Sequence, residues 1–412
     1  METMVQRCAG LDIGKSDLKA CVRVPGPRGG RHHEVRTFTT TTSGLLELRD
    51  WLTSHQVIRV GMEATGVYWK PVYYMLEDAF DTQLLNARHM HNVPGRKTDV
   101  SDAAWIAQLV EHGLVRPSFV PPPPIRRLRD LTRYRSAVTA ERSRDKQRLE
   151  KVLEDAGIKL SVVATDILGV SGRAMLGALI AGERDPAVLA DLARARMRAK
   201  LAELRLALVG RFDDHHAFLC QVILERIDAA TATIAKLTAQ IDAEIAPFQT
   251  TVERLATIPG VGIRLAQVII AETGGDMSRF ATAAHLASWA GMCPGNNESA
   301  GKQHSGHTRQ GDTWLRAALG EAAIAVTRSK NNYLIARYKR LTPRRGRKRA
   351  LVAVGHSILN AAWHILTYDI GYRDLGPDYF LTRLDPARAT RRILNQLHQL
   401  GYQAQLTPIE AR

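Results

Sequence analysis

Residues 8–24 read CAGLDIGKSDLKACVRV, and this stretch decides the fold of the N-terminal part of the chain. The apolar run at 9–14 predicts a strand, residues 14–17 predict a tight turn, and residues 18–24 predict the returning strand of a hairpin. Short apolar runs then alternate with amphipathic helical segments to about residue 112. This alternation is typical of an α/β sheet domain.

The elements expected after the hairpin follow from the same patterns of apolar spacing and capping residues. They are a strand near 34–39, a helix capped by Ser43 and running through residue 54, a strand at 57–62, an aromatic-rich helix at 66–80, a strand at 83–86 and a helix at 98–111 capped by Thr98.

The bulk composition indicates a large basic protein with a polyanionic partner. With 412 residues, the chain exceeds what one hydrophobic core usually supports. Lysine and arginine outnumber aspartate and glutamate by 57 to 41, which gives a net charge of +16. Nucleic acid is the first candidate partner, and the alternative is a general compositional bias toward basic residues.

Four widely separated cysteines with no CxxC spacing predict neither a zinc site nor a disulfide framework, in keeping with a reducing compartment. The N-terminus lacks the apolar segment of a signal peptide, and no run of about 18 apolar residues is present to span a bilayer. We therefore expect a soluble, cytoplasmic protein.

A run of four prolines at 121–124 marks the clearest boundary in the sequence. Two long helices, at 125–156 and 215–246, have apolar spacings that favour an antiparallel coiled coil. The expected organisation is an α/β domain at 1–116, a proline linker and coiled-coil region at 117–250, a mainly helical domain at 251–375 and a tail at 376–412.

Four acidic residues stand at positions where a sheet domain can bring them together. Asp12 lies in the first strand and Glu63 follows a later one, while Asp99 and Asp102 share one face of the helix at 98–111. Convergent carboxylates repel one another unless they hold cations, and such hard oxygen ligands suit Mg²⁺ or Mn²⁺.

The alternative is that these acids are ordinary strand-end charges and helix N-terminal residues. Lys15 and Lys97 lie near the acids in sequence and are expected to neutralise phosphate. Asp17, Asp50 and Glu111 are expected to be solvated surface charges.

The C-terminal region contains a glycine turn and a small-residue loop. Residues 255–272 read as a helix-hairpin-helix, in which Gly260 and Gly262 let backbone amides approach a DNA phosphate, and the alternative is a tight turn between packed helices. Further on, a loop rich in glycine, asparagine and histidine holds Ser299 and Lys302, and its small residues are expected to let Lys302 lie close to a nucleic-acid phosphate. From composition alone Ser299 reads as a hydrogen-bonding loop residue, and Ser305 is an equal candidate for a nucleophile.

Two segments concentrate positive charge. Residues 126–148 hold nine basic and three acidic residues, and residues 337–349 hold eight basic and no acidic ones. We expect both to contact a nucleic-acid backbone, and the alternative is a solvated helix face. The residues singled out are Arg126, Arg127, Arg344, Arg345, Arg347 and Lys348.

Together these motifs resemble the IS110/IS1111 family of insertion-sequence transposases, the RNA-guided bridge recombinases. The resemblance covers nearly the whole chain. The segments that carry it, in family order, are LDIGKSDLKACV, GMEATGVYWKPV, NARHMHNVPGRKTDVSDAAWIAQL, LATIPGVG, GMCPGNNESAGK and GDTWLRAAL.

The resemblance implies a RuvC-like domain of the ribonuclease H fold, a coiled coil and a C-terminal transposase domain with a nucleophilic serine. Asp12, Glu63, Asp99 and Asp102 fall on the family's DEDD acids, and Ser299 falls on its serine. Family members read Ser-Gly-Gly-Lys where this chain has an alanine, Ala300, as the second residue. The resemblance also implies a guide RNA that selects DNA targets by base pairing, and protomers that assemble up to a tetramer on DNA.

The expected activity is therefore DNA strand transfer, in which Ser299 attacks a DNA phosphate and the metal-bound acids stabilise the developing charge. Two other hypotheses remain open. A junction-resolving nuclease would use the four acids without Ser299, and a non-catalytic nucleic-acid-binding protein would use neither.

Overall fold

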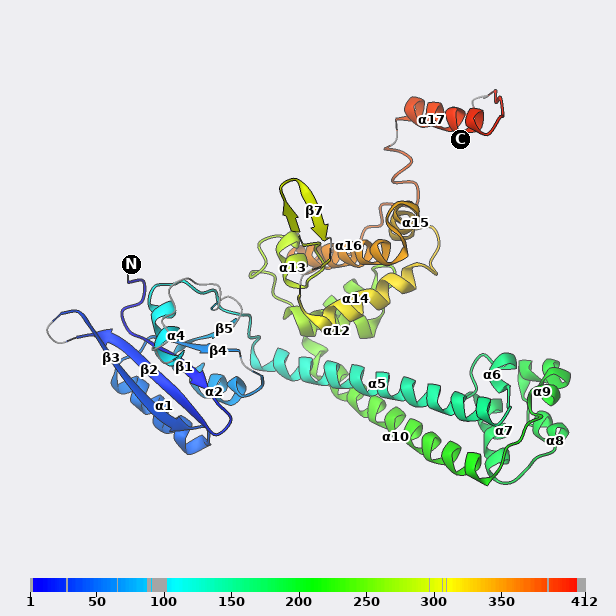
Figure 1. Cartoon of the computed structure of the whole chain (residues 1–412), viewed down its shortest axis with the longest axis horizontal. Helices are drawn as coiled ribbons and strands as arrows, with labels where there is room; N and C mark the ends of the chain where they lie inside the picture. The colour runs from blue at the N-terminus through cyan, green and yellow to red at the C-terminus, as the bar shows by residue number, and fades with distance from the viewer. Residues whose placement is uncertain are drawn as a thin grey trace. The chain divides into compact units, whose positions relative to one another are not determined.

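The computed structural model describes residues 3–26, 29–64, 66–86, 90, 102–295, 297–305, 307–308, 310–383 and 385–405, without the side chains of residues 297–299, 303–305 and 386. Two compact units make up the chain, Met1–Pro121 and Pro122–Arg412 (Figure 1). Their boundary falls within the proline run that the sequence marks, and the expected limits at residues 250 and 375 fall inside the second unit.

The first unit is built on a mixed five-stranded sheet in the order β3-β2-β1-β4-β5. β1 pairs antiparallel with β2 and parallel with β4, so the carboxyl ends of β1 and β4 meet at one edge. The α/β prediction is confirmed. The strands are β1 (Cys8–Ile13), β2 (Asp17–Pro25), β3 (Arg31–Thr39), β4 (Arg59–Glu63) and β5 (Asp81–Leu85), and the helices are α1 (Thr42–Ser54), α2 (Trp69–Leu76) and α4 (Asp102–Glu111).

Both faces of this sheet are covered. Successive residues of a strand point to opposite faces, so Leu11 enters the core shared with α1 and α2 while Gly10 lies against α4. Cys8 follows the same alternation and packs with residues of α4 such as Leu109. The sheet therefore has one face for α1 and α2 and another for α4.

Some element ends differ from the sequence-based expectation. The N-cap of α1 is Thr41, whose hydroxyl accepts a hydrogen bond from the amide of Gly44, so Ser43 lies inside the helix. The helix expected from residue 66 begins only at Trp69, because Gly66 has a φ of 56°, which an α-helix cannot contain.

Glu111 is a correction, because it is buried rather than solvated. Its side chain is 1% exposed and accepts a hydrogen bond from Arg23 of β2 at 2.7 Å. Arg31 of β3 forms a second ion pair with it. These contacts join the end of α4 to the hairpin of β2 and β3. Arg23 and Arg31 lie far from Glu111 in the sequence, so no local pattern indicated these ion pairs.

Two long helices open the second unit and lie side by side, α5 (Pro123–Asp155) and α10 (Asp214–Glu244) (Figure 1). Pro123 and Pro124 form the first turn of α5, where a missing amide hydrogen costs no helical hydrogen bond. Arg142 of α5 donates to Thr231 of α10, and Asp145 accepts from Arg226, so the pair runs antiparallel. The two predicted helices are confirmed to within three residues at their ends.

A small helical cap with its own apolar core packs at the end of this pair where α5 ends and α10 begins. Its elements are α6 (Leu160–Val163), α7 (Val170–Ile180), α8 (Pro186–Asp191), the 3-10 helix η1 (Ala195–Lys200) and α9 (Leu201–Ala207).

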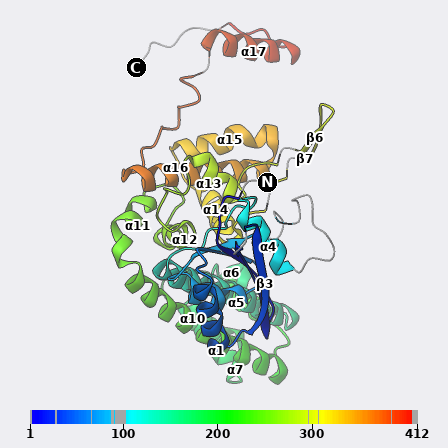
Figure 2. The ribbon, with the colours of Figure 1, turned by 90° about the vertical axis from the view of Figure 1, so that its left-hand side faces the viewer.

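The other end of the pair, where α5 begins and α10 ends, joins a helical body that contains the largest apolar core of the unit. Figures 1 and 2 show α12 to α16 gathered together, with a two-stranded hairpin projecting from them. The elements are η2 (Ala246–Phe248), α11 (Gln249–Ala256), α12 (Ile263–Thr273), α13 (Ala283–Trp289), β6 (Asn297–Ser299), β7 (Lys302–Ser305), α14 (Thr313–Val326), α15 (Tyr333–Arg345), α16 (Arg347–Tyr368) and, in the tail, α17 (Pro386–Gln399).

Among the described residues, α16 has the length and apolar composition of a membrane-spanning helix. Val354, Ile358 and Leu359 of this helix are fully buried in the core of the helical body, and three basic residues occupy its first turn. A buried core helix passes the same test, and the packing of α16 accounts for its composition.

Candidate catalytic and nucleic-acid-binding sites

Two of the predicted metal ligands end neighbouring strands on the same face of the sheet. Leu11 of β1 is in register with Met62 of β4, so the next residues, Asp12 and Glu63, lie beside each other. Each acid stands two residues after a glycine that faces α4, and period-two alternation turns the acids toward α4 as well. The sequence pattern Gly-x-acid in both strands thus places two carboxylates at one edge.

The glycines bring α4 close enough to supply a third acid. A Cβ on Gly10 would lie 2.2 Å from the amide nitrogen of Ala107, and a Cβ on Gly61 would lie 2.4 Å from a methyl carbon of Val110. Asp102 begins α4 on this side. Burial raises the pKa of Asp12 above its ordinary value, and the nearby negative charge of Asp102 raises it further.

Such crowding of like charges is what a cation would relieve, and carboxylate oxygens are the donors that Mg²⁺ prefers. Within the described residues, no three Asp, Glu, His or Cys side chains come close enough to hold an ion. Asp99 and Lys97 lie outside the described residues, as does Thr98. Lys15 is exposed in the turn between β1 and β2. The acids of the described residues therefore do not form a complete metal-ligand set by themselves.

Ser299 is the last residue of β6, immediately before the turn of the β6–β7 hairpin. It is in register with Lys302, and the two turn residues, Ala300 and Gly301, have φ values of 51° and 74°. Positive φ at both central positions is the pattern of a type I′ turn. The sequence led us to expect a loop here from its glycine, asparagine and histidine content, and the structure forms a hairpin instead.

We expect Ala300→Gly to stabilise this hairpin by up to about 1 kcal/mol, because alanine pays a steric cost at positive φ that glycine does not. Hydrogen exchange of the hairpin amides should slow by up to about fivefold. Gly301→Ala should have the opposite effect, and Gly320→Ala, whose added methyl meets open space in α14, should have none on the hairpin. Faster exchange in Ala300→Gly would contradict this account of the turn.

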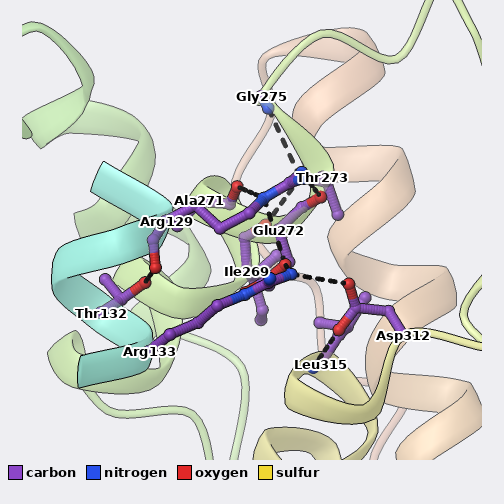
Figure 3. A network of polar contacts seen from close by, with 10 residues as sticks. All are labelled: Arg129, Thr132, Arg133, Ile269, Ala271, Glu272, Thr273, Gly275, Asp312 and Leu315. Carbon is purple, nitrogen blue, oxygen red and sulfur yellow. Dashed lines mark hydrogen bonds and ion pairs between the residues drawn. The ribbon is translucent and has the colours of Figure 1, made fainter. Parts of the chain in front are cut away.

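A buried ion-pair network lies behind the end of this loop, where α14 begins (Figure 3). Glu272 of α12 is fully buried and accepts two hydrogen bonds from Arg133 of α5, at 2.8 and 2.7 Å. Arg129 also approaches Glu272, at 3.2 Å, and Arg133 reaches Asp312 at 3.6 Å. Asp312 caps α14 by accepting from the amide of Leu315.

This network connects α5, α12 and α14 at the point where the chain leaves the serine loop. Burial raises the pKa of Glu272, while the hydrogen bond from Arg133 opposes that shift. Sequence reasoning missed these residues as a group, because Arg133 and Glu272 are 139 positions apart. It treated Arg129 and Arg133 only as part of a basic surface, although both are committed to an internal carboxylate.

The two glycines of the turn between α11 and α12 differ in their surroundings. Gly260 has a φ of 86°, and a Cβ there would lie 2.5 Å from the carbonyl oxygen of Ala322 in α14. Packing against α14 therefore requires this glycine. Gly262 has an ordinary φ of −94°, and a Cβ there would meet nothing within 4 Å. Only Gly262 leaves open space beside its backbone.

The two basic segments are placed differently. Arg344 and Arg345 end α15, Arg347 and Lys348 begin α16, and all four are exposed around Gly346. At the start of α5, Arg127 is exposed and Arg126 is partly buried. Lys302 is exposed beside the hairpin turn. The turn between α15 and α16 therefore exposes more positive charge than the start of α5.

Two family profiles match the chain. Residues 9–158 match a profile for DEDD transposases of the IS110 type, described as "Transposase". Residues 252–339 match the profile described as "Transposase IS116/IS110/IS902 family". The first match includes all four predicted acids, and the second includes Ser299.

Curated relatives agree. The chain is 32% identical over 126 residues to a putative transposase of Sinorhizobium fredii, covering 29% of this chain and 32% of the relative. It is 31% identical over 125 residues to the transposase for insertion sequence element IS1111A of Coxiella burnetii, covering 29% and 34%. It is 27% identical over 309 residues to an uncharacterized 42 kDa protein of insertion element IS900 from Mycobacterium paratuberculosis, covering 68% and 75%.

The matched region therefore spans about a third of the first two relatives and three quarters of the third. The two profiles occur in the order that the sequence motifs predict. The first match runs from the first unit through α5 of the second, and the second match lies within the second unit. The chain belongs to the IS110 family of transposases.

Proposed function

We propose that this protein is the DNA transposase of an insertion sequence, and that it cuts and rejoins DNA through Ser299 with the help of a metal-binding carboxylate site. The observation that carries the proposal is the placement of Asp12 and Glu63 at adjoining ends of parallel strands, facing Asp102 of α4, in a member of this family. The strand order of the sheet supports a RuvC-like assignment for the first unit.

Asp12, Glu63 and Asp102, with Asp99, would hold Mg²⁺ or Mn²⁺. A divalent ion bound there would stabilise negative charge on a DNA phosphate and on the departing oxygen. Burial and the nearby negative charge of Asp102 raise the pKa of Asp12, which supports this assignment. We also infer that α5 with α10 is the family's coiled coil, and that α11 with α12 is a helix-hairpin-helix.

In the proposed step the Oγ atom of Ser299 attacks a DNA phosphorus. A serine–phosphate bond forms, one phosphorus–oxygen bond of the DNA backbone breaks, and the departing deoxyribose oxygen takes up the proton that the serine loses. Attack by the hydroxyl of another strand end then reverses the step and releases Ser299. The number of phosphodiester bonds is unchanged, so rejoining needs no nucleotide hydrolysis.

The proposed partners are the DNA of the element ends and target, and a guide RNA. The exposed basic turn between α15 and α16 supplies charge that binds backbones without reading sequence, as a protein guided by RNA requires. We further propose a homo-oligomer of two to four protomers on DNA, in which the acids of one protomer act on the serine of another.

The decisive experiment incubates purified protein with element-end DNA, Mg²⁺ and RNA transcribed from the element's flanks. Wild type should form a protein–DNA adduct that survives denaturant, and Ser299→Ala should form none. Ser305→Ala, which changes the other serine of the hairpin, is the matched control and should retain the adduct. DNA cleavage that proceeds without an adduct and is unaffected by Ser299→Ala would favour the junction-resolving nuclease instead.

A further inference from the structure

The outermost strand of the first unit has a free edge. β3 ends the five-stranded sheet and pairs with β2 along its whole length, from Arg31 to Thr39 (Figure 1). Within the part of the chain that the structure describes, no other segment forms a β-bridge with it. Alternate residues of β3 therefore direct their backbone N–H and C=O groups away from β2, where a further strand could pair with them.

The opposite edge of the sheet is partly covered. The linker after α4 crosses β5, where Pro117 forms a β-bridge with Leu85 and the amide of Ser118 donates to the carbonyl of Leu84 at 2.6 Å. β3 contains no proline or lysine, and its register with β2 is continuous, without a bulge. These are the features that commonly prevent an edge strand from pairing with another chain. The edge of β3 is therefore open to strand addition.

The side chains of β3 are exposed on both faces of the sheet. Six consecutive residues are exposed, and Phe38 enters the core. Alternation places Glu34 and Arg36 on the face of α1, where Oε2 of Glu34 lies 3.4 Å from Nε2 of His55. The guanidinium of Arg36 lies over the ring of Phe38, 4.9 Å from its centre. Val35, between the two charges, lies on the other face and is 46% exposed.

This order of charges makes the edge complementary to itself. When two copies of a strand pair antiparallel about a two-fold axis perpendicular to the sheet, paired residues share a face, so the axis passes through one residue position. An axis at Val35 places Glu34 of each copy opposite Arg36 of the other. An axis at position 34 or 36 would place two glutamates or two arginines opposite each other, which is unfavourable. The register centred on Val35 is therefore favoured over its neighbours.

We propose that a second copy of this chain adds to the edge of β3 by antiparallel pairing about Val35, which joins the two sheets into one continuous sheet. Backbone hydrogen bonds supply the attraction, and the two Glu34–Arg36 pairs select the register and the partner. A two-fold axis uses the same surface on both copies, so the contact closes on itself. The inference deepens the proposed function by naming a contact of the oligomer, and it rests on that function only for the premise that protomers assemble.

The test measures self-association of the full-length chain by sedimentation velocity, in EDTA and without nucleic acid. Glu34→Arg and Arg36→Glu each place like charges opposite one another twice, and each should raise the dimer dissociation constant about tenfold. In an equimolar mixture of the two variants, one strand is basic at both positions and the other is acidic, so the mixed dimer should form as tightly as wild type. Asp78→Arg, an exposed charge reversal just before β5, is the control and should behave as wild type.

A mixture that associates no better than either variant alone would overturn the proposal. Because neither DNA nor metal is present, this outcome is independent of the Ser299 adduct. Adduct formation by a chain that fails the mixing test would keep the proposed function and remove the interface. Restored association in the mixture without any adduct would keep the interface and remove the serine mechanism.

Disulfide trapping reads the register directly. An axis at Val35 brings the Cα atoms of the two Val35 residues to about 4.5–5.5 Å, so Val35→Cys should give a covalent dimer under mild oxidation. Thr37→Cys lies on the same face, but its two copies would be about 13 Å apart and should not cross-link. Three native cysteines are buried and Cys293 is partly exposed, so the unchanged chain under the same oxidation gives the background. Equal cross-linking of Val35→Cys and Thr37→Cys would contradict the proposed register.

Discussion

Replacing Asp12 by asparagine is expected to lower metal-dependent DNA cleavage by about two to three orders of magnitude, while DNA binding is retained. Asparagine keeps the size and one oxygen of the side chain but removes the negative charge. Asp12 lies in β1 on the α4 face, next in register to Glu63 and within electrostatic reach of Asp102. Loss of its charge should therefore weaken the hold on the ion more than it affects the fold.

The measurement is the rate of adduct formation in Mg²⁺, together with DNA affinity measured without metal. Asp50→Asn makes the same chemical change on the exposed surface of α1 and should behave as wild type. Restoration of activity in Asp12→Asn by excess Mn²⁺ would agree with a weakened metal site. Full activity of Asp12→Asn in Mg²⁺ would rule out Asp12 as a metal ligand.

Replacing Glu272 by glutamine is expected to lower the free energy of unfolding of the second unit by roughly 3 kcal/mol, at the lower end of the range for breaking a buried ion pair. Arg133 would lose the anion that accepts its two hydrogen bonds, and the amide nitrogen of glutamine would face a guanidinium donor. The lower figure applies because the side chain of Arg133 is 33% exposed, so water can compensate in part.

Urea unfolding followed by tryptophan fluorescence would measure the effect, and Trp314 of α14 lies beside Arg133 as a local reporter. Glu321→Gln, on the exposed side of α14, is the matched control and should change stability by less than about 0.5 kcal/mol. Because Asp312 shares Arg133 with Glu272, Glu272→Gln should also loosen the start of α14 and speed hydrogen exchange there. Stability equal to wild type would show that the network contributes little.

Much of this protein could be predicted from local sequence. Period-two and helical spacing depend on neighbouring residues only, so the strands of the sheet and the helices α5 and α10 were predicted close to their true limits. The acids Asp12 and Glu63 were recognisable for the same reason, because each lies at the carboxyl end of a buried strand. The family motifs are likewise continuous segments, and the profile matches bear them out.

The tertiary structure decided what depends on residues far apart in the chain. From the sequence alone Glu111 was predicted to be a surface charge, but β2 and β3 place Arg23 and Arg31 against it. No sequence pattern marks Glu272, whose arginine partners come from α5. Gly260 and Gly262 are alike in sequence, yet only Gly260 lies against the backbone of α14. Burial and charge pairing are properties of packed surfaces, so a local pattern can nominate a residue for a site but cannot tell which partner the fold will give it.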